Sequence, residues 1–356
     1  MLKIILNIYV LIVLFNNYQK IKAQVHLSKD NLNELCNCNS FASRKIILSS
    51  ENISTIDPLT FNGLYSLQVL LLQSNQLTKI DEFTFKELSS LRYLYLSNSH
   101  LTTLDQSTFN GLTSLIDLEL NSNQIKAIHE KTFNGLMNLQ SVYFNRNQIK
   151  ELHSNTFIGL AKLEIISFHS NQIKELDSNI FGGLMNLKNI NFGHNKLEEL
   201  HEMIFKELIS LKKLEFCGNE IKELQPLIFY GLNSLEIISF HSNQIKEINK
   251  KLFNGLTSLE WIYFSKNEIK QLHRNSFKGL IKLKTISFFD NKIKEIHKKL
   301  FNGLISLEKV SFDNNQIIDI HKNTFNGLMN LKKIEFRCNQ IKKINKSTFN
   351  GSKILY

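Results

Sequence analysis

The chain has 356 residues, a formal net charge of +11 at pH 7 and only four cysteines. So few cysteines exclude a small scaffold held together by disulfides, and a secreted chain of this size must instead rely on a hydrophobic core. After the N-terminal segment no stretch is apolar enough to span a membrane, which excludes a protein with several membrane spans.

Residues 1–24 are predicted to be a secretory signal peptide. Lys3 precedes an apolar run from Ile4 to Phe15, and a small residue suits cleavage near Ala23 or Gln24. A membrane anchor is the alternative, but the run is about 12 residues long and a spanning helix needs about 20. We therefore expect a protein that is secreted to the extracellular space or matrix, without a membrane span, and with a mature net charge of about +8.

Residues 25–44 are predicted to be an abbreviated N-terminal cap, because the first coil of a repeat array would otherwise expose its apolar face. This segment contains two cysteines, Cys36 and Cys38. A bond between them would close a very small, strained ring, so their pairing stays open at this point.

Residues 45–356 are predicted to form an array of about 13 repeats. The segment LEIISFHSNQIKE occurs at 163–175 and again, unchanged, at 235–247. These copies define a 24-residue register that runs along the array without insertion or deletion. Asparagine occupies 11 of 13 positions in one column, with Glu51 and Ser99 as exceptions, and phenylalanine occupies all 13 positions from Phe61 to Phe349 in another. Such a period indicates stacked coils.

The repeat unit, LxxLxLxxNxIxxIxxxxFxxLxx, predicts an α/β solenoid shaped as a curved horseshoe. The LxxLxL part is expected to form a short strand, and successive strands a concave parallel sheet of about 13 strands. Polar cap residues and a glycine column predict a convex side of turns and short 3-10 or helical segments. We assign 22 of the 26 phenylalanines to interior stacks, and the asparagine column to hydrogen bonds with the turning backbone.

This unit resembles that of the extracellular, 24-residue class of leucine-rich-repeat proteins, such as Slit, the ectodomains of Toll-type receptors and small matrix proteoglycans. The resemblance covers Lys45 to Leu355. It implies a protein that binds an extracellular protein or glycan on its concave sheet, with a role in adhesion, signalling or innate recognition. Such relatives have an N-terminal cap richer in cysteine, and this chain also lacks a recognisable C-terminal cap. The alternatives are a structural matrix component that binds polyanionic or fibrous partners, and a truncated ectodomain of a Toll-like membrane receptor.

Residues that project onto the concave face vary between repeats, and one group of them is a candidate partner-binding site. Trp261, the only tryptophan, and Tyr263 project from one predicted strand, and Phe289 projects from the next. Aromatic side chains grouped in this way resemble an interaction hot spot. A self-packed patch without a partner and a homodimer contact are the alternatives. The predicted group comprises Trp261, Tyr263, Phe289, Ile237, His241 and Lys266.

A second, weaker patch is predicted on the same face. It consists of Arg92, Tyr93 and Tyr95, beside Val69 and Leu71 of the preceding repeat. Cys217 and Cys338 are also expected on the concave side, five repeats apart and therefore too distant to pair with each other.

Three further patterns have predominantly structural or surface interpretations. The sequons at Asn52, Asn345 and Asn350 predict N-glycosylation in the terminal repeats alone. Six histidines share the convex cap column, where a polar cap is favoured over a metal-binding or pH-sensing stripe. A lysine column from Lys126 to Lys342 is interpreted as a solvated edge instead of a polyanion site, because glutamate follows most of its members.

The sequence predicts no catalytic site, metal site or cofactor. It contains no GxSxG elbow, HExxH motif, Walker loop or Cys/His metal spacing, so an enzyme is not expected. Nucleic acid is not expected as a partner of a secreted chain.

Overall fold

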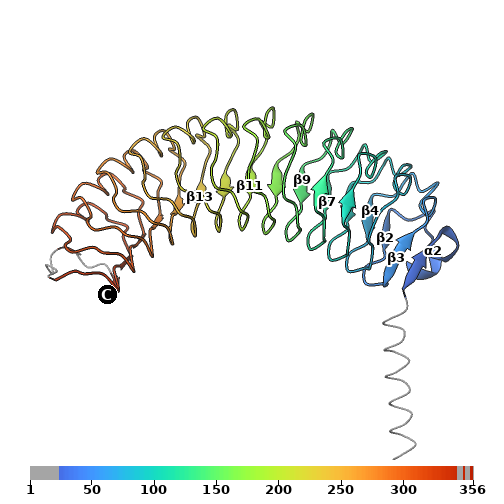
Figure 1. The fold of residues 1–356 in the computed structure, drawn as a ribbon, viewed down its shortest axis with the longest axis horizontal. Coiled ribbons are helices and arrows are strands. Elements are labelled where there is room, and N and C mark those ends of the chain that lie inside the picture. The colour runs from blue at the N-terminus through green and yellow to red at the C-terminus, as the bar shows by residue number, and fades with distance from the viewer. Residues whose placement is uncertain (1–23, 343–347, 349–352, 356) are drawn as a thin grey trace, which may run out of the picture.

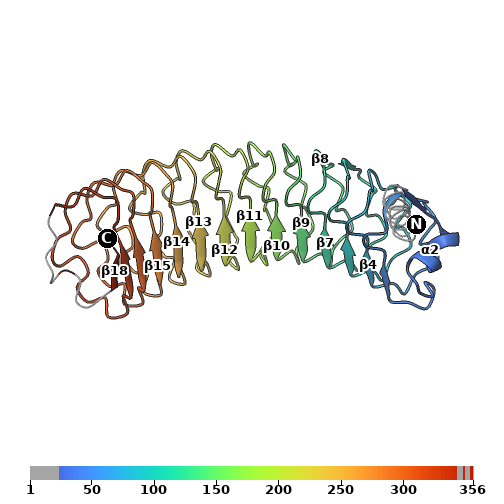
Figure 2. The same cartoon turned by 90° about the horizontal axis from the view of Figure 1, so that it is seen from below.

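The computed structural model describes residues 24–342, 348 and 353–355, and residues 1–23 of the predicted signal peptide lie outside this part. Fourteen parallel strands form one sheet in chain order, and this sheet lines the inner side of an arc (Figures 1 and 2). The predicted horseshoe with a parallel sheet of about 13 strands is confirmed. The strands of the sheet are β2 (Lys45–Ile47), β4 (Val69–Leu71), β5 (Tyr93–Tyr95), β7 (Asp117–Glu119), β9 (Ser141–Tyr143), β10 (Ile165–Ser167), β11 (Asn189–Asn191), β12 (Lys213–Glu215), β13 (Ile237–Ser239), β14 (Trp261–Tyr263), β15 (Thr285–Ser287), β16 (Lys309–Ser311), β17 (Lys333–Glu335) and β18 (Lys353–Leu355).

Neighbouring strands from β2 to β17 are related by the repeat length. Ile237 of β13 lies opposite Trp261 of β14, and Trp261 lies opposite Thr285 of β15. Because this offset equals the repeat, each sequence column becomes a row of neighbours along the solenoid. The columns of the sequence therefore correspond directly to surfaces and core layers.

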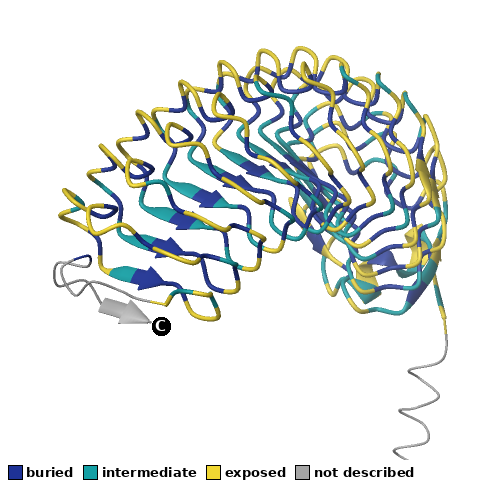
Figure 3. Cartoon of the chain, turned by 60° about the vertical axis from the view of Figure 1, so that its left-hand side comes forward, coloured by how far each residue is buried: buried dark blue, intermediate teal, exposed yellow. Residues whose placement is uncertain are grey.

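The core is a continuous layer between the sheet and the convex turns, and it follows the whole arc (Figure 3). One row of it is the phenylalanine column from Phe61 to Phe325, and the other begins at Leu72 and is phenylalanine from Phe144 to Phe336. All of these side chains are buried, which confirms the predicted interior stacks for the described phenylalanines.

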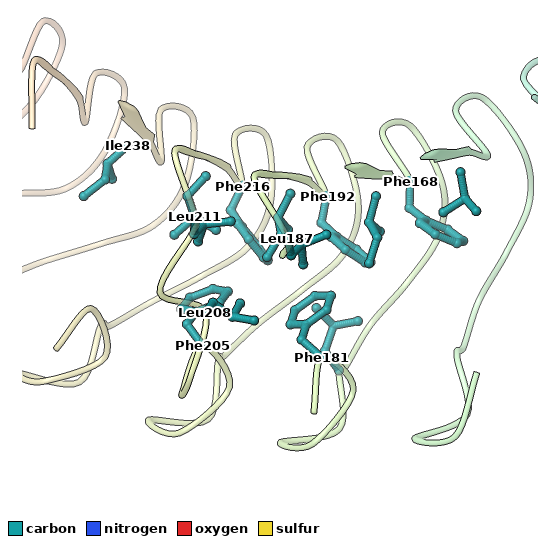
Figure 4. Close-up of a cluster of buried hydrophobic side chains, with 14 of the residues drawn as sticks. Phe168, Phe181, Leu187, Phe192, Phe205, Leu208, Leu211, Phe216 and Ile238 are labelled. Carbon is teal, nitrogen blue, oxygen red and sulfur yellow. The ribbon is translucent and has the colours of Figure 1, made fainter. Parts of the chain in front are cut away.

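Phe192 illustrates the packing between the two rows (Figure 4). Its ring centroid lies 5.4 Å from that of Phe168 and 5.7 Å from that of Phe216, in stacked pairs with the coils on either side. It also lies 5.9 Å from the centroid of Phe181, edge to face. Offset stacking and edge-to-face contacts are the arrangements that aromatic rings favour.

Asn171 illustrates how the asparagine column holds the turn that follows each strand. Its Nδ2 donates to the carbonyl oxygens of Phe144 and Phe168, at 2.9 and 3.0 Å, and its Oδ1 accepts from the backbone N–H of Ile149 at 3.1 Å. The same set recurs from Asn75 to Asn339, except at position 99. One buried amide thus satisfies three backbone groups that cannot join the sheet, which confirms the structural role of the column.

The convex side consists of turns instead of helices in the described residues, and the predicted polar caps are present there. Asp177 Oδ1 accepts from the N–H of Asn179 at 2.8 Å. Histidines of the same column accept through Nδ1 from the N–H two residues later: His129, His153, His201, His273, His297 and His321. The cap interpretation of these histidines is therefore confirmed. The glycine column completes each turn with a left-handed backbone, as at Gly303 with φ 82°.

The N-terminal end has its own small elements. Strand β1 (Val25–Leu27) pairs in parallel with β3 (Ile53–Ile56), and helix α2 (Lys29–Leu35) follows. Leu27 and Leu32 are buried against the first coil. Cys36 and Cys38 form a disulfide, which settles the pairing that the sequence left open. A separate two-stranded sheet joins β6 (Thr103–Leu104) to β8 (Ala127–Ile128).

The C-terminal end departs from the repeat frame. Strand β18 pairs with β17 so that Ile354 lies opposite Ile334, an offset of 20 residues instead of 24. Leu355, which lies opposite Glu335, therefore does not continue the 24-residue register. Since an uncovered edge strand leaves a row of open N–H and C=O groups, the shorter connection brings residues 353–355 back to pair with that edge.

Candidate functional site

In the sheet strands from β2 to β17, two residues of each strand reach the concave face and one points into the core. In β14 the central Ile262 is fully buried, whereas Trp261 and Tyr263 on either side are partly exposed. Because side chains alternate along a strand, this pattern repeats in most coils and creates a surface of non-repeated residues. This surface holds both predicted patches.

Trp261 lies in a row with Ile237 and Thr285, as the sequence predicts. The Nζ atom of Lys284 lies 5.1 Å from the centre of the indole, and the same Nζ forms a 2.6 Å ion pair with Glu260. A cation on the ring face is favourable. One face of Trp261 is therefore covered by a paired lysine, which leaves a smaller apolar surface than the sequence suggests.

The remaining predicted residues lie further along the sheet. The carbonyl of Phe289 accepts from the N–H of Lys266 at 2.7 Å, in the turn that follows the strands. His241 occupies the row of Phe289, two coils before it, and its Nδ1 lies 2.8 Å from Ser239 Oγ. Four residues separate this row from that of Trp261, about 13 Å along a strand. Trp261 and Phe289 therefore lie in separate rows, and the predicted residues form a band across the sheet.

The second patch is more extensive than predicted. Tyr93 lies opposite Asp117, and Tyr95 lies opposite Glu119, which in turn faces Tyr143. The Arg92 guanidinium lies 6.0 Å from the centre of the Tyr93 ring. The sequence analysis missed the two carboxylates and Tyr143. All three occupy strand positions of the next two repeats that project onto the concave face, and this pattern could have identified them.

The electrostatics of this patch are unusual for the concave face. Asp117 Oδ1 is buried without a hydrogen-bond partner, whereas Glu119 Oε1 accepts from Ser97 Oγ at 3.0 Å and Asn121 Nδ2 at 2.9 Å. Burial, and secondarily the charge of Glu119, raises the pKa of Asp117 to about 6. Most other concave carboxylates are paired with a lysine or arginine: Glu164, Glu215, Glu236, Glu260, Glu308, Asp313 and Glu335.

The middle of the concave face carries histidines and a thiol. The His169 and His194 rings lie 4.8 Å apart, edge to face, and burial followed by the charge of His194 lowers the pKa of His169. Burial raises the pKa of the Cys217 thiol on the next coil. Cys338 lies in the left-handed turn after β17, with φ 55°, and is exposed. Cys217 and Cys338 are both free thiols.

In the described part of the chain, a hollow of about 380 Å³ borders the second patch, and Arg92 forms part of its lining. Another hollow, about 820 Å³, lies on the outer flank from Ala127 to Asp177, and equivalent positions line hollows in later coils. Within the described residues, no three His, Cys, Asp or Glu side chains are arranged to hold a metal ion. A helix with the length and apolarity to cross a membrane is absent from the same residues.

One predicted glycosylation site falls in the described structure. Asn52 is partly exposed, with φ 57°, in the turn before β3, and its carbonyl accepts from the Val25 N–H at 2.9 Å. Asn345 and Asn350 lie outside the described residues.

Comparison with known proteins agrees with this architecture. The model of the BspA type leucine rich repeat region matches residues 102–236 and 222–356, and a leucine rich repeat model matches residues 44–101. No curated protein matches the chain. TLR13, solved in complex with ssRNA13, is 28% identical with a TM-score of 0.77, over 93% of this chain and 48% of that one.

Two other solved structures show the fold alone. Toll, in the Toll–Spatzle complex of Drosophila, is 18% identical with a TM-score of 0.79, over 93% of this chain and 46% of that one. An internalin, InlF, of Listeria monocytogenes is 22% identical with a TM-score of 0.72, over 92% of this chain and 88% of that one. The chain therefore spans about half the length of TLR13 and Toll. Because the family models match residues 44–356 and every described coil has the repeat's strand and turn, the chain belongs to the leucine-rich-repeat family.

Proposed function

We propose that this protein is a secreted, non-enzymatic recognition protein that holds an extracellular protein on its concave sheet. The observation that carries the proposal is the band of Trp261, Tyr263 and Phe289 on a sheet whose core positions are strictly repeated. A scaffold alone would need only the repeated residues. Large aromatic side chains on the variable surface supply the apolar area that interaction hot spots use.

The geometry favours a protein ligand with an extended contact surface. The aromatic band crosses the sheet instead of enclosing a cavity, and Ile237, His241 and Lys266 border it. A flat, mixed surface of this kind suits a macromolecule better than a small ligand, which would need a concave pocket. The structures of TLR13 with ssRNA13 and of Toll with Spatzle provide precedents for ligand binding by this fold.

A second candidate is the ectodomain of a Toll-like membrane receptor. The likeness to TLR13 at 28% identity over 93% of this chain favours it. The concave surface would serve the same purpose there. A transcript that joins this sequence to a membrane-spanning segment would support the receptor, and transcripts that encode only the secreted form would reject it.

Capture of a ligand from the extracellular fluid of the source organism tests the proposed surface. Wild-type protein and the variant Trp261→Ala/Tyr263→Ala/Phe289→Ala would be immobilised, and bound proteins identified by mass spectrometry. We expect a ligand that the wild type retains and the triple variant loses at least about tenfold, since each hot-spot truncation costs on the order of 1–2 kcal/mol.

The matched control is Met137→Ala/Ile158→Ala/Tyr230→Ala, which removes exposed apolar side chains from the convex turns. It should keep the ligand. Equal capture by all three proteins would reject the aromatic band as the binding surface. A concentration-dependent dimer of the wild type that the triple variant abolishes would instead identify the band as a contact between two copies.

A further inference from the structure

The charge of this solenoid is strongly divided along its length. Residues 24–241 contain 18 Lys and Arg against 23 Asp and Glu, a net charge of −5. Residues 242–356 contain 22 Lys and Arg against nine Asp and Glu, a net charge of +13. The basic character of the protein therefore belongs to its C-terminal third. A potential of one sign over a long surface attracts ligands of the opposite sign.

The concave side of that third does not offer most of these charges to a ligand. Lys284 is paired with Glu260, Lys332 with Glu308, and Arg337 with Asp313. Lys309 and Lys333 share Glu335. Several exposed cations of the convex turns form no ion pair within the described residues.

A row of four cations occupies the convex turns, directly after the cap residues. We call this row the basic stripe: Lys250, Arg274, Lys298 and Lys322. Each side chain is exposed, and none forms an ion pair within the described residues. The coils are bridged immediately beside the stripe, by Ile248 with Leu272 and by Ile296 with Ile320.

The stripe is a local feature of the array. In the coils before it, the same column contains three glutamates and no cation: Glu82, Glu130 and Glu202. Lys251 and Lys299 stand next to the stripe and are exposed as well. Glu247, Glu295 and Asp319 lie on the adjoining flank, and none of them is within 4.0 Å of a stripe cation. Six cations thus face three unpaired acids.

We propose that the basic stripe binds a linear sulfated polysaccharide. A polysaccharide with sulfate groups on successive sugars presents anions in a row, and the stripe presents one cation per coil along four coils. The guanidinium of Arg274 suits a sulfate because it donates two parallel hydrogen bonds. This site is separate from the concave surface of the proposed function, and only the choice of a polysaccharide rests on the proposed secretion.

Two other polyanions fit the stripe less well. Single-stranded nucleic acid is usually held by aromatic side chains that stack on its bases. The aromatic residues of the described chain that are classed as exposed are Phe41, Tyr65, Phe83 and Tyr230, and none of them lies in the coils of the stripe. An anionic membrane is a plane, whereas the turns between β13 and β17 follow the outer curve of the arc and bend away from a plane (Figure 1).

Heparin is the probe for the experiment, with the full secreted chain. The variant Lys250→Gln/Arg274→Gln/Lys298→Gln/Lys322→Gln removes the stripe. We expect its dissociation constant for heparin to rise about tenfold or more, since each exposed ion pair contributes on the order of a factor of two to five. The matched control, Lys126→Gln/Lys131→Gln/Lys150→Gln/Lys174→Gln, removes four exposed cations from N-terminal coils and should change the constant less than about twofold.

Further measurements decide between the polyanions. Single-stranded RNA of matched charge and vesicles containing phosphatidylserine should bind more weakly than heparin at about 0.15 M salt. Equal loss of heparin binding in both glutamine variants would overturn the stripe as the binding site. Tighter binding of RNA or vesicles than of heparin would overturn the polysaccharide as the ligand. The stripe variant should still capture the concave ligand, so failure of one proposal leaves the other measurable.

Discussion

At the residue scale, the asparagine column shows how the backbone of each turn can require the same side chain in repeat after repeat. Each buried amide supplies two donors and one acceptor to three backbone groups of the turn. Ser99 is the informative exception, because its buried Oγ has no hydrogen-bond partner. A hydroxyl at this position is too short to replace the amide. Between Asn75 and Asn339 the column is therefore a structural requirement with one defect.

Substitutions at Asn171 and Ser99 should change the free energy of unfolding in opposite directions. Asn171→Ala leaves three buried backbone groups unsatisfied and should lower the free energy of unfolding by about 3 kcal/mol. Ser99→Asn restores the missing amide and should raise it by about 1 kcal/mol. Urea unfolding followed by circular dichroism measures both. A Ser99→Asn protein that is no more stable than the wild type would contradict the interpretation of Ser99 as a defect.

Asp117 is expected to make stability depend on pH. Burial, and secondarily Glu119, raises its pKa from 3.8 to about 6 in the folded protein. Between these values the folded state binds more protons than the unfolded state, so its contribution to stability falls as the pH rises from about 4 to 6. Ionised Asp117 therefore opposes folding at pH 7.

The variant Asp117→Asn should consequently melt about 2 °C higher than the wild type at pH 7, and the difference should vanish near pH 4. Differential scanning calorimetry at both pH values measures this. The control is Glu119→Gln, which should gain less than Asp117→Asn, because its carboxylate already accepts two hydrogen bonds and its charge is only the secondary cause of the raised Asp117 pKa. A gain of the same size at pH 4 would show that charge is not the cause.

At the element scale, the coil is the unit that the sequence specifies best. The strand, the turn with its asparagine, and the cap with its histidine or aspartate recur with the same hydrogen bonds because each depends on residues within one or two repeats. The aromatic rows join the coils, since Phe192 contacts rings before and after it. Stability therefore depends on packing between neighbours as much as on each coil.

Phe192 offers a test of this packing. Phe192→Ala creates a cavity in both neighbouring contacts and should lower the free energy of unfolding by about 3–5 kcal/mol. Phe192→Leu introduces the residue that the same column has at Leu120, and should cost about 1–2 kcal/mol. Thermal unfolding of both variants measures the difference. Equal destabilisation by Leu and Ala would show that ring stacking, and not filled volume, dominates.

At the scale of the whole molecule, the solenoid separates two surfaces that lie near each other in sequence. Trp261 belongs to a strand on the concave side, and Lys250 and Arg274 belong to the turns before and after it on the convex side. Because every coil passes both faces, the array can vary each face independently of the core. The two proposed ligands would thus bind the same coils without competing for the same residues.

The sequence by itself determined the fold, the period, the interior phenylalanines, the asparagine hydrogen bonds and the polar caps. It could do so because these features repeat every 24 residues and involve contacts between residues close in sequence or in adjacent repeats. The column assignment also placed the predicted residues of both patches on the sheet, although it missed Asp117, Glu119 and Tyr143, and their ligand binding stays a prediction.

Tertiary structure alone decided the features that depend on distance across the sheet or on an irregular end. The separation of Trp261 from Phe289 follows from strand register, and the cover on the Trp261 ring follows from the position of Lys284. The pairing of β18 with β17 follows from a connection shorter than the repeat. These features do not recur with the period, so their side chains and edges meet only once the coils are stacked in space.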